Sequence, residues 1–189
     1  MILLAVAQVA LCYITVLLSR YAIYERRRSI SKTEPLFDVV HDALDLTPRG
    51  VQLTRGAANC LQTALIATGA IILIGRRDLV EGFVRVLTVG YSIRALFVVL
   101  TIVPPPTEDC EFHRRLTVHG QCSDLYISGH QMVNVVICLG LLKLGRISIR
   151  TAVALSLLSG LLIVAGRNHY TVDVMAGALL AEACVRNLL

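Results

Sequence analysis

The segment from Ile147 to Gly166 reads ISIRTAVALSLLSGLLIVAG, and Arg150 near its start is its only charged residue. A helix that crosses a bilayer needs about 20 mostly apolar residues, and this segment has that length and composition. Five further segments are similar, and in chain order they are 2–19, 56–75, 83–103, 126–144 and 170–189. The sequence therefore predicts an all-α, polytopic membrane protein: a bundle of six transmembrane helices that forms one membrane-embedded domain over residues 1–189.

The composition of the chain favours the same class. Of its 189 residues, 56% are hydrophobic and 16% are charged, and the mean hydropathy is +0.70. Soluble domains average about 45–50% apolar and about 25% charged residues. The net charge of +5 is typical of some nucleic-acid binders, but the basic residues cluster between the apolar segments, as in membrane proteins. This composition excludes a soluble enzyme, a disordered tail and a nucleic-acid binder.

The polar connections separate these segments. Residues 20–55 form a long charged stretch in which Pro35, Pro48 and Gly50 are expected to act as breakers. Pro104–Pro106 is expected to end the third helix, since proline cannot continue one. The first apolar segment lacks a basic leader and is long for a signal peptide, which favours a retained helix over a cleaved one. His41, in the long stretch, is expected to face solvent.

Two polar stretches lie where loops enter apolar helices: CSDLYISGH at 122–130 and RNHYTVD at 167–173. His169 and Asp173 are four residues apart, so on a helix they share a face. A carboxylate beside an imidazole orients it and stabilises its cation. His130 comes from another helix, directly after Gly129, which allows a close approach of substrate or backbone.

Two histidines and an aspartate that converge from two helices suit phosphoryl transfer. One histidine attacks phosphorus, the aspartate orients it, and the other histidine protonates the leaving alcohol. Arg94, in the middle of a span, and Arg167 are candidates for binding phosphate. Three alternatives stay open: satisfied interfacial histidines, a zinc site, for which no third ligand with metal geometry is evident, and a proton relay in a transporter.

These motifs resemble those of the sphingomyelin synthase family, a branch of the lipid phosphate phosphatase superfamily. The family pattern C-G-D-x-x-x-S-G-H-T is similar to residues 122–131, and H-Y-T-x-D-V matches residues 169–174 at every fixed position. P-L-P-D is approximated by Pro35–Asp38, and R-x-x-T running into L-P-x-P is loosely matched from Arg94 to Pro106. The resemblance runs from about residue 24 to the end of the sequence.

The chain also departs from these patterns. Ser123 replaces Gly, Gln131 replaces Thr and Phe37 replaces Pro, and none of these changes removes a catalytic group. The lipid phosphatases carry K-x6-R-P, whereas this sequence contains no Arg-Pro pair. The absence favours a transferase over a simple phosphatase.

The resemblance implies a ceramide phosphotransferase that needs no cofactor and no metal. It would move phosphocholine, phosphoethanolamine or phosphoinositol from a glycerophospholipid to the primary hydroxyl of ceramide and release diacylglycerol. His169, aided by Asp173, would become a phosphohistidine, and His130 would act as acid and then as base. The expected substrate-binding residues are Arg94, Asp124, Ser128, Gly129, Arg167 and Tyr170.

The expected partners are these two lipids and the surrounding membrane, and a homo-oligomer is compatible with the sequence. By resemblance, the protein resides in the Golgi or plasma membrane with its site facing the lumen or exterior. Loop charges alone favour the opposite orientation. A lipid phosphatase or phospholipase C-like hydrolase with the same triad, and a non-enzymatic lipid transporter or binding protein, remain as alternatives. The headgroup donor and a disulfide between Cys110 and Cys122 are left open.

Overall fold

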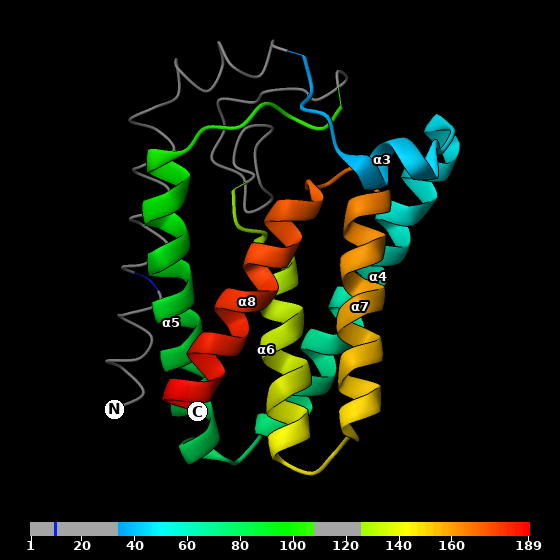
Figure 1. Ribbon diagram of the computed structural model, residues 1–189. Helices are drawn as coiled ribbons and strands as arrows, with labels where there is room; N and C mark the ends of the chain where they lie inside the picture. The colour runs from blue at the N-terminus through cyan, green and yellow to red at the C-terminus, as the bar shows by residue number, and fades with distance from the viewer. Residues whose placement is uncertain (1–9, 11–33, 108–125) are drawn as a thin grey trace.

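The computed structural model describes residues 34–107 and 126–189, together with residue 10. Within these ranges the regular structure is helical (Figure 1). The helices are α3 (Val39–Leu44), α4 (Pro48–Leu73), α5 (Arg77–Leu100), α6 (Gly129–Lys143), α7 (Ile149–Ala165) and α8 (Thr171–Leu188). The predicted first span, 2–19, lies outside the described residues except for residue 10.

Helices α4 to α8 overlap the other five predicted spans, with ends that differ by up to eight residues. Among the described residues, only α4 is both long and apolar enough to cross a membrane by length and composition. Helices α6 and α7 are apolar but have 15 and 17 residues, which is about 22 and 26 Å at 1.5 Å per residue. The hydrocarbon core is about 30 Å thick. The described residues therefore form an all-helical bundle with one clear candidate span, and the six-span arrangement remains a prediction.

Pro48 begins helix α4 instead of breaking the chain, so the sequence-based expectation for this residue is wrong. Thr47 is the N-cap, and its hydroxyl accepts a hydrogen bond from the Gly50 amide at 3.2 Å. Proline is favoured at the first position of a helix, because its fixed φ suits the helix and its missing N–H is not needed there. Helix α4 consequently starts eight residues before the predicted span, which began at residue 56.

Helix α6 lies at the centre of the bundle, where it packs against α8 and α7 and also against α4 and α5 (Figure 1). One buried apolar cluster joins α5, α6 and α8 around Met132 and Val136. A second joins α4, α6 and α7 around Cys138. A third, around Ile163, brings α4, α7 and α8 together at the end of the bundle where α3 lies. These contacts bring the start of α6 and the start of α8 to the same end of the molecule.

Large apolar side chains are exposed on the outer faces of the bundle. On α4 and α7 they include Leu53, Ile66, Ile71, Ile149, Val153, Leu157, Leu158 and Leu161, and on α5 and α8 Leu96, Phe97, Leu100, Val172, Met175 and Leu179. Extensive exposed apolar surface is typical of sites that contact a membrane or another protein. Such faces are typical of helices that contact lipid.

Candidate active site

The turn before α6 places His130 at the start of that helix. Ile127 has φ 65°, which is an outlier for a β-branched residue. Ser128 then caps α6, because its side-chain oxygen accepts a hydrogen bond from the Gln131 amide at 3.2 Å. Strained backbone of this kind is concentrated at functional sites, and here it directs the chain into the helix that carries His130.

The same turn is joined to α8 by a backbone contact. The Ser128 amide donates to the Asp173 carbonyl oxygen at 2.8 Å. Gly177 allows this close approach, because a Cβ there would lie 2.5 Å from the Ser128 carbonyl oxygen. Two segments that are 45 residues apart in the sequence, at Ser128 and Asp173, are thereby held in register.

At the start of α8, the Asp173 carboxylate lies between a backbone amide and an imidazole. Its Oδ2 accepts a hydrogen bond from the Tyr170 amide at 3.1 Å and lies 3.7 Å from His169 Nδ1. Oδ1 is buried and makes no hydrogen bond within the described part of the chain. A separation of 3.7 Å is too long for a hydrogen bond, but catalytic contacts of this kind often shorten only when substrate binds.

The two histidines lie beside each other, although His130 is on α6 and His169 is in the turn before α8, not on the helix that carries Asp173 as the spacing predicted. Their ring centroids are 6.0 Å apart and the ring planes meet at 63°. His169 is 4% exposed and Asp173 is 1% exposed, while His130 is half-buried. The structure thus brings His130, His169 and Asp173 together, with the carboxylate on the Nδ1 side of His169.

Arg94 of α5 reaches the same end of the bundle. Its side chain is 6% exposed, and its Nε donates to the Ile127 carbonyl oxygen at 2.9 Å. A Cβ at Gly129 would lie 3.2 Å from this Nε, so the glycine leaves room for the guanidinium. Arg94 is therefore placed against the backbone that leads into His130.

Arg167 lies in the turn between α7 and α8, two residues before His169. It has φ 51°, and its side chain is half-buried. Arg55 of α4 fixes this turn, since its Nε donates to the Gly166 carbonyl oxygen at 2.6 Å. A cation at the C-terminal end of a helix is also favoured by the helix dipole.

Asp38 contacts the start of α8, a role that the sequence did not predict. Its Oδ2 accepts from the Thr171 amide at 2.7 Å and its Oδ1 from the Thr171 hydroxyl at 2.9 Å. Burial opposes ionisation of this carboxyl, but the hydrogen bonds from Thr171 and from the His41 amide, with the nearby imidazole, lower its pKa. The match at residues 35–38 was the only sequence signal that could have found it.

His41 is buried, so the expectation that it faces solvent is wrong. Its side chain is 8% exposed, and its ring centroid lies 5.7 Å from that of Tyr170. Burial lowers the pKa of His41; the carboxylate of Asp38 opposes this shift and the charge of Arg167 adds to it. Its surroundings therefore favour the neutral form of the imidazole beside the candidate site.

Tyr170 connects three separate segments. Its hydroxyl accepts a hydrogen bond from the Leu36 amide at 2.9 Å and donates to the Pro104 carbonyl oxygen at 3.1 Å. The tyrosine side chain is 3% exposed. Asp124, Cys110 and Cys122 lie outside the described residues.

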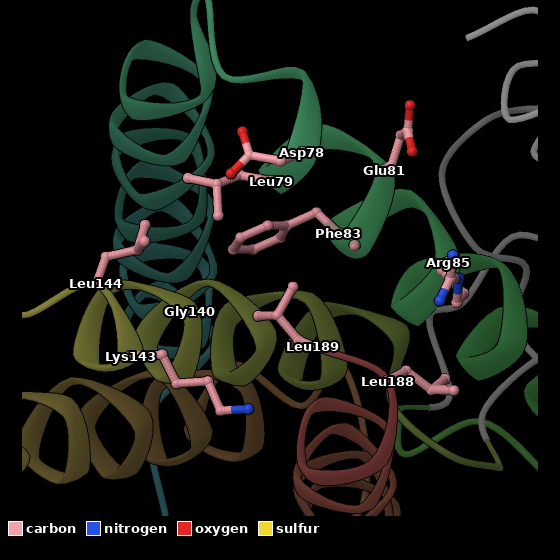
Figure 2. A pocket seen from close by; sticks show the side chains of 11 residues that line it. Asp78, Leu79, Glu81, Phe83, Arg85, Gly140, Lys143, Leu144, Leu188 and Leu189 are labelled. Atoms are coloured by element: carbon pink, nitrogen blue, oxygen red, sulfur yellow. The ribbon is translucent and has the colours of Figure 1, made fainter. Parts of the chain in front are cut away.

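The described residues also form a cavity of about 540 Å³ at the opposite end of the bundle (Figure 2). It lies between the start of α5 and the ends of α6 and α8, where Phe83 points toward the α6 backbone at Gly140. No candidate site residue lines it. Because the cavity holds no histidine, the chemistry points to the other end of the bundle.

The described donor groups at the candidate site are two imidazoles, a carboxylate and nearby guanidinium groups. Within residues 34–107 and 126–189, no three His, Cys, Asp or Glu side chains are grouped so that they could hold a metal ion. The arrangement offers instead a buried imidazole backed by a carboxylate, a second imidazole, and arginines nearby. These are the groups that nucleophilic attack on a phosphate ester requires.

Comparison with known families agrees with this chemistry. Residues 121–188 match the family model described as PAP2 superfamily C-terminal. The matched region contains His130, His169 and Asp173 and is consistent with the lipid phosphate phosphatase superfamily. It implies phosphatase- or phosphotransferase-type activity on lipid phosphates, with a role in lipid metabolism and association with a membrane. No curated protein matches the chain.

Proposed function

We propose that this protein transfers a phospho-headgroup from a glycerophospholipid to the primary hydroxyl of ceramide, with His169 as the nucleophile. The observation that carries the proposal is the position of Asp173 on the Nδ1 side of His169, 3.7 Å away, while His130 lies at a ring-centroid separation of 6.0 Å. This arrangement supports His169 as the nucleophile and His130 as the proton donor.

In the first step, Nε2 of His169 attacks the phosphorus of the donor lipid. An N–P bond forms and the bond between phosphorus and the glycerol oxygen breaks. His130 gives its proton to this departing oxygen, which becomes the hydroxyl of diacylglycerol. Asp173 stabilises the positive charge that develops on the His169 ring. Arg94 and Arg167 are the candidates for stabilising the phosphoryl oxygens.

In the second step, the acceptor hydroxyl attacks the phosphohistidine. His130, now neutral, takes the hydroxyl proton, the N–P bond breaks and the new P–O bond forms. His169 is 4% exposed, and exclusion of water from such a site protects a reactive intermediate from hydrolysis. This burial and the absence of an Arg-Pro pair in the sequence support transfer over hydrolysis.

The lipid substrates fit the surroundings of this site. The helices that flank it expose large apolar side chains, including Leu157 and Leu161 on α7 and Val172 and Met175 on α8, and these faces suit contact with acyl chains. We extend the proposal to a Golgi or plasma membrane location, with the site facing the lumen or exterior.

The experiment that tests the function uses detergent-solubilised protein and fluorescent ceramide. The donor is a mixture of phosphatidylcholine, phosphatidylethanolamine and phosphatidylinositol, and products are separated by headgroup. One labelled phosphosphingolipid that disappears in His169→Ala would support the transferase and name its donor. Release of diacylglycerol without a ceramide product would favour the hydrolase, and no turnover by folded protein would refute both.

A further inference from the structure

The Asp38 carboxylate connects two helix starts that are far apart in the sequence. It caps α3, where Oδ1 accepts from the amides of Val40 and His41 at 3.0 and 3.2 Å. It also binds the first residue of α8, where Thr171 donates both its amide, at 2.7 Å, and its hydroxyl, at 2.9 Å. One side chain thus accepts hydrogen bonds from two helices, across 133 residues of sequence.

The contact to α8 satisfies an amide that the helix itself cannot. The first N–H groups of a helix have no partner within it, and Tyr170, the N-cap residue, makes no side-chain hydrogen bond to them by itself. A carboxylate at this end is further stabilised by the helix dipole. Hydrogen bonds to charged groups are also stronger than those between neutral groups. Asp38 therefore holds the first turn of α8 more firmly than a neutral cap would.

In the sequence, Thr171 lies between the two residues that the proposed reaction needs at the start of α8. His169 precedes it by two positions and Asp173 follows it by two. Tyr170, in the same turn, is held through its hydroxyl by Leu36 and Pro104. A shift of this turn would therefore change the approach of His169 to phosphorus and its distance from Asp173 together.

We propose that Asp38 is a positioning residue, which acts through Thr171 to align His169 and Asp173 for attack on phosphorus. This inference rests on the proposed function, and it adds residues outside the matched region 121–188 to the site. Asp38 is not a catalytic residue, because it contacts the backbone and hydroxyl of Thr171 and not the reacting atoms.

The test compares kcat, KM and thermal unfolding of four variants of the full chain in the ceramide assay. Asp38→Asn replaces one acceptor oxygen by an NH2 group, which cannot accept from Thr171 or from the α3 amides. Thr171→Val removes only the hydroxyl donor, and Thr171→Ser restores it. Ser148→Ala is the matched control: Ser148 caps α7 by accepting from the Thr151 amide at 3.1 Å, at the far end of the bundle.

We expect Asp38→Asn to lower kcat by about 10- to 100-fold, because a displacement near 1 Å costs up to about 100-fold. KM should stay within about twofold. Thr171→Val should lower kcat by a smaller factor, and Thr171→Ser should return it to the wild-type value. Ser148→Ala should lower the unfolding temperature without changing kcat.

Two results would overturn the inference while the function stands. One is an unchanged kcat in both Asp38→Asn and Thr171→Val. The other is a fall in kcat in Ser148→Ala that matches Asp38→Asn at the same loss of unfolding temperature, since the effect would then reflect stability alone. A wild-type protein that turns over no lipid would refute the proposed function, and this inference with it.

Discussion

Asp173→Asn should separate activity from stability in this protein. The substitution keeps the shape of the side chain and one oxygen that can accept from the Tyr170 amide. It removes the negative charge 3.7 Å from His169 Nδ1. The side chain is 1% exposed, so bulk water screens its charge only weakly.

The expected loss of activity follows from this distance. Two unit charges 3.7 Å apart attract each other by about 4.5 kcal/mol at an effective dielectric constant of about 20. The attraction acts on the cationic ring of His169, which forms during attack. Since about 1.4 kcal/mol corresponds to a factor of ten in rate, the turnover number should fall by about 10³-fold.

Stability should move in the other direction. One Asp173 oxygen is buried and makes no hydrogen bond within the described residues, and burial of a charged group whose hydrogen bonds are incomplete is costly. The neutral amide lowers that cost, so the unfolding temperature should stay the same or rise. A substitution that lowers activity without lowering stability is expected where a charge is kept for catalysis at the expense of stability.

The assay measures turnover of fluorescent ceramide and, separately, thermal unfolding in the same detergent. Asp78→Asn is the matched control, because the Asp78 side chain is 69% exposed and lies 3.5 Å from Arg76, at the far end of the bundle. It should leave turnover unchanged. Turnover within tenfold of wild type in folded Asp173→Asn would refute the role given to this carboxylate.

Three further outcomes follow from the packing and the charges. Gly177→Ala should lower the free energy of unfolding by about 1–3 kcal/mol in denaturant titrations, because its Cβ would meet the Ser128 carbonyl oxygen at 2.5 Å. Gly56→Ala has open space around it and should instead raise the free energy of unfolding by up to about 1 kcal/mol. At Ile127, with φ 65°, the glycine variant should be at least as stable as the alanine variant, since glycine avoids about 1–2 kcal/mol of left-handed strain; a less stable glycine variant would contradict this. Burial lowers the pKa of His41 below its ordinary value of 6.5, so near this pH the unfolded chain binds more protons than the folded one. Stability should therefore fall as the pH drops below about 6.5, and unfolding curves of His41→Gln should lack this loss.

The sequence by itself determined where the helices form and that His169 and Asp173 lie close together. Apolar segments form helices because a helix satisfies its own backbone hydrogen bonds, and α4 to α8 overlap five of the predicted apolar segments. His169 lies one residue before Tyr170, the N-cap of α8, so the shared helical face that the spacing predicted is not formed, although the two side chains still lie 3.7 Å apart. The ends of the helices were less predictable, since Pro48 suits both a break and a first helical turn.

Only the tertiary structure decided which groups lie beside His169 and Asp173. The Ser128 amide reaches the Asp173 carbonyl, Arg94 reaches Ile127, and Asp38 reaches Thr171. Each contact joins helices that neither spacing nor periodicity relates, so no local pattern could place these groups together. The sequence predicted a solvent-facing His41 for the same reason, because its burial depends on how α3 packs against α7 and on the ring of Tyr170. Local hydrogen bonding and periodicity fix the elements, whereas packing between distant segments fixes the site.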